Sequence, residues 1–349
     1  MKVLFLTTHS YIPQRSGGSE SSTNELCNIL VERGHNVAVI SSLVPNTKIW
    51  LLNRIKSKIT QKKAPVDNYA GYPVYRSWNI LEGLSEVIAE FLPDCVVTQA
   101  GECIPIIKQL VRMKIKTFIY LRDVEFQMHG GDYFNNKFLQ YIANSNFTAQ
   151  RFHETFGIPA HVIPPLINYN KYQVNSSKEK VLFVCPKKEK GLDIALKLAE
   201  KNPDIPFLFL ESWQLNEIEL NALHNEIKLL PNIEFLLAQA DMKPIYAVTK
   251  LALVPSSWEE AWGRIASEAQ VSGIPVLASN RGGLPESVGN GGVLHKIEED
   301  IDIWSKSLRK IWFDKDYYKK LSNNAKIRSQ RQETQPEYLI DKFINCLSS

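Results

Sequence analysis

The first third of the chain alternates short apolar runs with longer amphipathic segments. The segment Ser21 to Arg33 has helical spacing and ends at the turn Gly34-His35. Apolar runs rich in β-branched residues predict strands at Val3 to Leu6, Val37 to Ile40, Val74 to Tyr75, Cys95 to Thr98 and Thr117 to Tyr120. Apolar strands separated by helices predict a doubly wound, parallel α/β domain, whose ligands bind beyond the carboxyl ends of the strands.

A second series of the same kind follows the loop Pro164-Pro165-Leu166 and the polar stretch Asn168 to Lys180, whose composition is typical of an interdomain linker. Strands are expected at Val181 to Val184, Phe207 to Leu210, Ile233 to Leu236, Leu251 to Val254 and Pro275 to Ala278. Helices are expected at Asp193 to Lys201, Asn216 to Leu230, Ile265 to Ser272 and Ile301 to Phe313. We therefore expect two domains, over 1–166 and 175–330, with a ligand-binding cleft between them.

Composition supports this division and excludes several classes of protein. At 349 residues the chain exceeds the usual size of one core. A hydrophobic fraction of 44% is ordinary for a soluble protein, and a net charge of +4 is too small for a dedicated nucleic-acid binder. The 5 cysteines show no C-x-x-C pair and no zinc spacing. We expect free thiols and a cytoplasmic protein, with no nucleic-acid partner.

The chain offers no segment that predicts membrane insertion. The apolar run Val3 to Leu6 is too short for the core of a signal peptide and has the pattern of a first strand. No uninterrupted apolar stretch approaches the roughly 20 residues that cross a bilayer. Any membrane contact is therefore expected to be peripheral.

The most specific motif is the run from Pro255 to Ala269, which contains Glu260 and Glu268 and is followed by S-G-I-P-V and G-G-L-P-E. Glu260 ends a loop, and Glu268 lies in the helix that begins near Trp262 to Ile265. The start of a helix offers backbone N–H donors and a partial positive charge to a diphosphate or to sugar hydroxyls. The alternative is a helix cap followed by a solvated glutamate.

Two further loops have the composition of anion-binding turns. Gly17 and Gly18, in the run Pro13 to Glu20, lie between a strand and a helix, where the backbone can approach a phosphate closely. The loop Pro186 to Asp193 is lysine-rich, and a fixed lysine would stabilise a departing diphosphate. A tight turn and a solvated basic surface are the alternative interpretations.

The paired glutamates, in the frame P-S-x-x-x-E-x-x-G-x-x-x-x-E-A, resemble the donor-binding motif of glycosyltransferase family four, the retaining enzymes of the GT-B fold. The resemblance implies that Glu260 binds donor-sugar hydroxyls and that Glu268 holds the nucleotide ribose. It also implies a C-terminal helix, about 333–349, that crosses back to the N-terminal domain. The resemblance further implies that the residues around the start of the helix that carries Glu268 bind the donor, namely Ala261, Trp262, Gly263, Arg264 and Ile265.

The resemblance extends to other parts of the donor site. Gly17 and Gly18 are similar to the family's glycine-rich loop, which faces the donor diphosphate, and Lys190-Gly191 matches its lysine-glycine pair. The arginine that normally precedes that lysine by five residues is replaced by Cys185, so that Lys187 is the nearest basic candidate. The backbone near Leu236 and Leu237 is expected to receive the base.

Arg122 and Asp123 follow the predicted strand Thr117 to Tyr120, where the family commonly has His-Asp. An arginine stays protonated, so Arg122 can supply positive charge and hydrogen bonds but cannot act as a general base. His129 follows in a loop, and Asp123 and His129 are candidates for the acceptor side. The alternative for His129 is a structural or exposed histidine.

The segment 48–63 carries six positive charges and no negative one. Its apolar residues Leu51, Leu52, Ile55 and Ile59 fall on one face of a predicted helix, with Trp50 at the edge of that face. Such a helix could lie peripherally on the inner face of an anionic membrane or cover an acceptor groove. Alternatively, it packs on the first domain with its lysines in water.

The function predicted from these patterns is retaining, metal-independent transfer of a hexose from a UDP-sugar, first of all UDP-glucose, to a glycan or lipid-linked acceptor in polysaccharide or glycoconjugate biosynthesis. Glu260, Lys190 and Arg122 form the expected catalytic group. No Asp or His cluster predicts a metal, and no cofactor is expected. The alternatives are a sugar-nucleotide epimerase or phosphorylase of the same fold, a non-catalytic nucleotide-binding protein and, as the weakest choice, a nicotinamide oxidoreductase.

Overall fold

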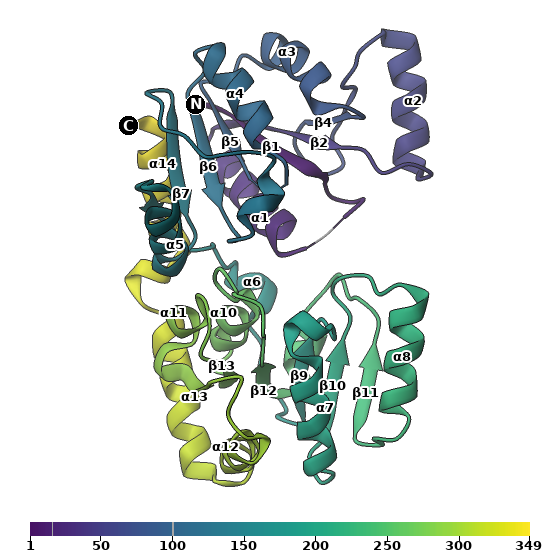
Figure 1. Ribbon diagram of the computed structural model, residues 1–349, viewed down its shortest axis with the longest axis vertical. Helices are drawn as coiled ribbons and strands as arrows, with labels where there is room; N and C mark the ends of the chain where they lie inside the picture. The colour runs from purple at the N-terminus through teal and green to yellow at the C-terminus, as the bar shows by residue number, and fades with distance from the viewer. Residues whose placement is uncertain (16, 100) are drawn as a thin grey trace. The chain divides into compact units, whose positions relative to one another are not determined.

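The computed structural model describes residues 1–15, 17–99 and 101–349, so that Ser16 of the predicted glycine loop lies outside the described residues. The chain forms two compact units, each an α/β sheet with its own helices (Figure 1). Unit 1 comprises Met1–Leu166 and Glu337–Ser349, and unit 2 comprises Ile167–Pro336. The doubly wound α/β class predicted from the sequence is confirmed for both units.

Unit 1 contains an eight-stranded sheet in the order β3-β4-β2-β1-β5-β6-β7-β8. Among its described pairs, β3 and β4 are antiparallel and the others are parallel. The strands are β1 (Lys2–Ser10), β2 (Asn36–Ser42), β3 (Val66–Asp67), β4 (Val74–Ser77), β5 (Cys95–Thr98), β6 (Thr117–Leu121), β7 (Leu139–Ala143) and β8 (His161–Val162). The helices are α1 (Gly18–Glu32), α2 (Lys48–Thr60), α3 (Ile80–Phe91), α4 (Ile104–Arg112), α5 (Asn146–Phe156) and α14 (Pro336–Ser348).

The central strand β1 is apolar on both faces, as a parallel strand covered by helices must be. Val3 and Phe5 belong to one buried cluster, and Leu4 and Leu6 belong to another on the opposite face. The C-terminal helix α14 supplies Phe343 to the first cluster, where its ring stacks on Phe5 with centroids 6.2 Å apart. The chain therefore returns to unit 1 at its C-terminal end, as the sequence predicted.

Unit 2 contains a six-stranded parallel sheet in the order β11-β10-β9-β12-β13-β14. Its strands are β9 (Lys180–Val184), β10 (Phe207–Leu210), β11 (Ile233–Leu236), β12 (Thr249–Val254), β13 (Val276–Ser279) and β14 (Gly292–His295). The helices are α6 (Tyr169–Tyr172), α7 (Leu192–Lys201), α8 (Glu217–Ile227), α9 (Lys243–Val248), α10 (Arg264–Val271), α11 (Leu284–Val288), α12 (Ile301–Phe313) and α13 (Lys315–Ser329). Phe183 and Leu182 of β9 point into separate cores on its two faces.

Residues 168–174 differ from the sequence prediction, which placed them in a polar linker before a domain that began at 175. In the structure Ile167 and Tyr172 are buried in a core of unit 2. The backbone N–H of Val174 donates a hydrogen bond to Ser272 Oγ at 2.9 Å. The polar composition of this segment predicted a linker, but the buried side chains of Ile167 and Tyr172 suffice to attach the segment to unit 2.

Candidate functional site

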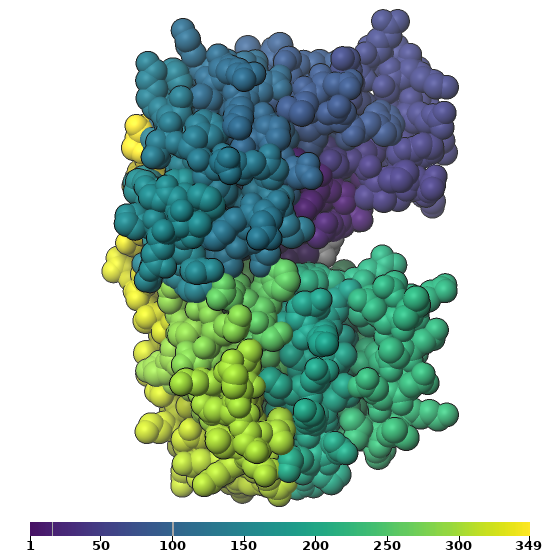
Figure 2. All heavy atoms as spheres, in the orientation of Figure 1, coloured from purple at the N-terminus to yellow at the C-terminus, as the bar shows by residue number. Residues whose placement is uncertain are grey.

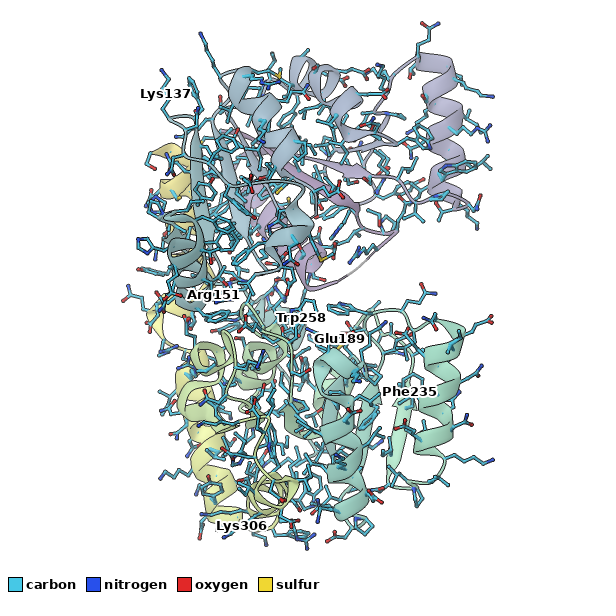
Figure 3. The ribbon with its side chains drawn as sticks, in the orientation of Figure 1. Lys137, Arg151, Glu189, Phe235, Trp258 and Lys306 are labelled. Atoms are coloured by element: carbon cyan, nitrogen blue, oxygen red, sulfur yellow. The ribbon has the colours of Figure 1, made fainter. Side chains whose placement is uncertain are left out.

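Two loops at the carboxyl ends of β9 and β12 are joined to each other in unit 2. The carbonyl oxygen of Glu189 accepts hydrogen bonds from the Ser256 hydroxyl at 3.2 Å, the Ser257 hydroxyl at 3.1 Å and the Trp258 N–H at 3.0 Å. Figure 3 labels Glu189 and Trp258 at this junction. Gly191 has a φ of +85°, and a Cβ there would lie 2.0 Å from the carbonyl oxygen of Pro255. The lysine-glycine pair therefore allows the two loops to touch.

This junction brings together Lys190 and Glu260, two of the three predicted catalytic residues. Lys190 Nζ lies 2.6 Å from Glu260 Oε1, and the side chains are 15% and 17% exposed. The same ammonium group lies 4.6 Å from the ring centroid of Trp213 and 5.9 Å from that of Trp258. A cation held by a carboxylate and two aromatic rings has a fixed position. Trp213 and Trp258 were not among the predicted site residues.

The backbone that follows Glu260 is held at the N-terminus of α10. Gly283 N–H donates to the Glu260 carbonyl oxygen at 2.6 Å, and a Cβ at Gly283 would lie 2.3 Å from the carbonyl oxygen of Ala261. Ala261 and Trp262 are buried, and the Trp262 indole N–H donates to Ser267 Oγ at 2.9 Å. The predicted G-G-L-P-E run therefore packs against the loop that carries Glu260 and holds its backbone in place.

Glu268 is buried at 5% exposure, so its interpretation as a solvated helical glutamate is wrong. Tyr246 OH donates to its Oε2 at 2.9 Å, and Arg264 Nε donates to its Oε1 at 3.0 Å. Arg264 also donates to Tyr172 OH at 3.1 Å. Burial, followed by the Glu268 carboxylate, raises the pKa of Tyr246 well above its ordinary value. Glu268 is therefore a fixed, oriented carboxylate.

Lys187 and Cys185 lie in the loop that precedes Lys190. Lys187 Nζ pairs with Glu219 at 3.0 and 3.1 Å, at the start of α8. Cys185 is buried, and burial raises the pKa of its thiol, whereas a hydrogen bond from the Trp213 backbone opposes that shift. The side chain that replaces the expected arginine thus contacts the loop that carries the ring over Lys190.

The sequence predicted that the backbone at the end of β11 contacts the base of the nucleotide. The Leu236 carbonyl oxygen accepts a hydrogen bond from Glu211 N–H at 2.9 Å, and the Leu237 side chain is exposed. The Glu211 carboxylate accepts from Leu215 N–H at 2.8 Å. Glu211, which sequence reasoning missed, connects the loops that follow β10 and β11.

The predicted glycine loop and Arg122 meet at the carboxyl end of the unit 1 sheet. Gly17 is the N-cap residue of α1 and Gly18 is the first residue of this helix. Arg122 Nη1 donates to the Ser19 carbonyl oxygen at 3.0 Å, and its guanidinium carbon lies 4.2 Å from the Tyr120 ring centroid. The helix start, the two glycines and a fixed cation are therefore close together, as an anion site requires.

Asp123 and His129, the predicted acceptor-side residues, contact each other. His129 Nε2 lies 2.8 Å from Asp123 Oδ1, and His129 Nδ1 hydrogen-bonds with Tyr133 OH. His129 is buried, whereas Asp123 is 31% exposed. Both ring nitrogens of the histidine are engaged, so the part of this pair that remains accessible is the carboxylate.

Glu125 adds a titratable group that sequence reasoning did not identify. Burial, followed by the charge of Asp123, raises its pKa from 4.5 to about 7. Because ionisation of Glu125 is harder in the fold than in the unfolded chain, its contribution to stability decreases as the pH rises from about 4.5 to about 7 and is constant above that. The variant Glu125→Gln cannot ionise and avoids this loss.

Denaturant unfolding of wild type and Glu125→Gln across this pH range measures the effect. The stability of the variant relative to wild type is expected to increase with pH and to level off above about pH 7. A difference that is constant, or that decreases with pH, would contradict the assigned environment of this carboxyl group.

The described parts of the chain, residues 1–15, 17–99 and 101–349, hold no group of three or more His, Cys, Asp and Glu side chains arranged to bind a metal ion. In the same residues no helix has the length and apolarity that crossing a membrane requires. All 5 cysteines are free and buried.

The sequence matches two family models that together span most of the chain. Residues 16–171 match Glycosyltransferase Family 4, and residues 168–328 match Glycosyl transferases group 1. Spore coat protein SA of Bacillus subtilis is 30% identical over 136 residues, which cover 35% of this chain and 36% of that protein. A D-inositol 3-phosphate glycosyltransferase of Mycobacterium sp. is 32% identical over 126 residues, covering 34% and 28%. The chain thus matches about a third of the length of these relatives.

Solved structures resemble the whole chain. Anabaena HepE in complex with UDP has a TM-score of 0.77 at 19% identity, with 100% of both chains covered. A glycosyltransferase from Rickettsia africae has a TM-score of 0.74 at 19% identity, with 99% of this chain and 97% of that chain covered. At this level of identity, the likeness shows the fold.

Proposed function

Because the chain belongs to the GT-B glycosyltransferases related to family four, as its motifs predicted, we propose that it transfers a hexose from a UDP-sugar to a glycan or lipid-linked acceptor with retention of configuration. The observation that carries the proposal is the Lys190–Glu260 pair in unit 2. A fixed cation and a fixed carboxylate lie side by side where the loops after β9 and β12 meet. They offer complementary groups to a sugar diphosphate.

Lys190 is proposed to stabilise the leaving group. As the bond between the anomeric carbon and the diphosphate oxygen breaks, negative charge grows on that oxygen, and a pre-positioned cation stabilises the transition state more than the ground state. In the structure Glu260 is the counter-ion of Lys190. Donor binding therefore exchanges this partner for the diphosphate and directs the Glu260 carboxylate to the sugar hydroxyls. Arg122, Gly17 and Gly18 stay predictions as further diphosphate ligands.

Glu268 is proposed to accept hydrogen bonds from the ribose. Its two oxygens are oriented by Tyr246 and Arg264, and each oxygen has a second lone pair. A buried carboxylate held in this way favours a ligand with the matching hydroxyl, because without that hydroxyl the second lone pair of each oxygen has no donor from the ligand.

Retention is proposed to follow from attack on the same face from which the leaving group departs. The acceptor oxygen forms a bond to the anomeric carbon, the diphosphate oxygen leaves with the bond's electron pair, and the acceptor proton passes to that oxygen. No metal ion takes part in the proposed step. Identical anomeric configuration in donor and product by NMR, with activity unchanged by EDTA, is the expected result. An inverted product would contradict the front-face step.

UDP-glucose is our first choice of donor, followed by GDP-mannose. Support comes from HepE, whose solved structures contain UDP and UDP-glucose. Ligands that bind the folded protein alone raise its melting temperature, and a concentration of about 100 times Kd adds about 2.7 kcal/mol. A thermal-shift screen should therefore give a clear increase with UDP and UDP-glucose and little with free glucose. No increase with any nucleotide or sugar nucleotide would contradict a donor site.

A further inference from the structure

Helix α2 has an unusual distribution of side chains. Asn53, on the side toward unit 1, is the one residue among the described residues of α2 that is fully enclosed, at 1% exposure. Leu51, Leu52, Ile55 and Ile59 are 53%, 46%, 47% and 77% exposed. Ile49, Trp50 and Ser57 are partly buried on the same side as Asn53. The four aliphatic residues face the solvent, where an ordinary surface helix has polar residues.

Polar contacts hold this helix in place. Thr47 caps it by accepting from Trp50 N–H at 3.1 Å, and Gln14 Nε2 donates to Thr47 Oγ1 at 2.7 Å. At the other end Ser57 Oγ donates to the Lys62 carbonyl oxygen at 2.7 Å. The aliphatic face takes little part in this attachment. Because exposed apolar surface gains about 25 cal/mol per Å² when it leaves water, the face favours contact with another apolar phase.

The charges within the segment that carries this face are all of one sign. The segment 48–63 contains six Lys and Arg residues and no Asp or Glu. At 100° per residue, Lys56 and Lys58 fall on opposite flanks of the aliphatic face. Lys62 and Lys63 extend the basic region at the C-terminal end, where they also pair with Glu90 at 2.5 Å and Glu82 at 3.7 Å. An aliphatic strip between basic flanks matches the boundary between acyl chains and anionic headgroups.

We propose that α2 docks unit 1 on the surface of an anionic lipid bilayer. Leu51, Leu52, Ile55 and Ile59 enter the headgroup region, and the basic flanks contact lipid phosphates. Figure 1 shows α2 at the edge of unit 1, and Figure 2 shows this segment on the molecular surface. A second copy of the chain is a poorer occupant, because its α2 would bring the same positive charges. The proposal does not depend on the proposed transfer reaction.

Cosedimentation with vesicles tests the proposal. Wild type is expected to bind vesicles of phosphatidylcholine with phosphatidylglycerol and to bind phosphatidylcholine alone much more weakly, with high salt reducing the binding. The variant Ile55→Ser/Ile59→Ser should bind the anionic vesicles at least about tenfold more weakly, since two buried aliphatic side chains are lost. The variant Arg54→Gln/Lys58→Gln should lower the salt dependence.

Ile218→Ser/Leu229→Ser is the matched control, because these residues are 82% and 80% exposed in unit 2. It should bind vesicles as wild type does. Circular dichroism and the denaturation midpoint establish that each variant is folded, without reference to donor binding. Equal binding by wild type and the α2 variant, or no binding to anionic vesicles, would overturn the proposal. A dimer in sedimentation that dissociates only in the α2 variant would assign the face to a second copy instead.

Discussion

Replacing Glu260 with glutamine is expected to lower the rate of sugar transfer by about 100- to 1000-fold, the typical loss when one oriented electrostatic contact to a transition state is removed. Glutamine keeps the shape of the side chain but removes its charge. It weakens the hydrogen bonds accepted from sugar hydroxyls and leaves Lys190 without its counter-ion, which now lies 2.6 Å away. Initial-rate measurements with saturating donor report the effect on kcat.

Glu259→Gln is the control for this prediction, because it removes an equal charge from the adjacent position of the same loop. This variant should keep turnover within a few-fold of wild type. Circular dichroism should show that both variants are folded. Wild-type turnover in Glu260→Gln would remove this carboxylate from the proposed step.

Replacing Arg76 with methionine is expected to destabilise the protein by about 3–5 kcal/mol, the usual result when one partner of a buried ion pair is removed. Arg76 is 0% exposed, and its Nε lies 2.6 Å from Asp67 Oδ2. Its guanidinium also donates to the carbonyl oxygens of Tyr11 at 3.2 Å and Ile12 at 2.6 Å. Methionine leaves the buried Asp67 carboxylate and both carbonyl groups without this donor.

Denaturant unfolding measures this loss, and a second variant identifies its cause. In Arg76→Met/Asp67→Asn the uncompensated charge is absent, so part of the stability should return. A loss below about 1 kcal/mol in the single variant would mean that the pair is not a structural element of unit 1. Since the Tyr11 and Ile12 carbonyls lead into the glycine loop, the single variant should also weaken any contribution of Gly17 and Gly18 to anion binding.

The strands that the sequence predicted best are those buried on both faces. Cys95–Thr98 and Phe207–Leu210 have the same limits in the structure as in the prediction. The limits of the edge strand Ile233–Leu236 were also predicted, although this strand is not buried. Continuous apolar runs between turn residues identify such strands. By contrast, β3 (Val66–Asp67) and β8 (His161–Val162) contain two residues each, too few for any periodicity to be recognised. They form because a neighbouring strand offers a free edge.

The candidate site was predictable where its residues are close in sequence. The frame around Glu260 and Glu268 and the pair Lys190-Gly191 could be recognised because the turn and the helix start constrain residue type at each position. Partners from distant strands could not be recognised. Trp213 reaches Lys190 because the parallel sheet places the loops after β10 and β9 at one edge. Tyr246 of α9 reaches Glu268 of α10 because the two helices share one core of unit 2.

The sequence could not predict whether the apolar face of α2 is buried or exposed. The pattern of Leu51, Leu52, Ile55 and Ile59 predicts one apolar face, but periodicity is the same whether that face meets a core or the solvent. The structure decides between them, because Asn53 is buried whereas Leu51, Leu52, Ile55 and Ile59 are exposed.

The structure of the complex with a UDP-hexose would test the donor site most directly. We expect the Lys190 Nζ to leave Glu260 and lie within hydrogen-bonding distance of a diphosphate oxygen. The Glu260 carboxylate should accept from sugar hydroxyls and Glu268 from the ribose. A complex in which Lys190 and Glu260 remain paired, with the ligand bound away from the loops after β9 and β12, would contradict the proposed function.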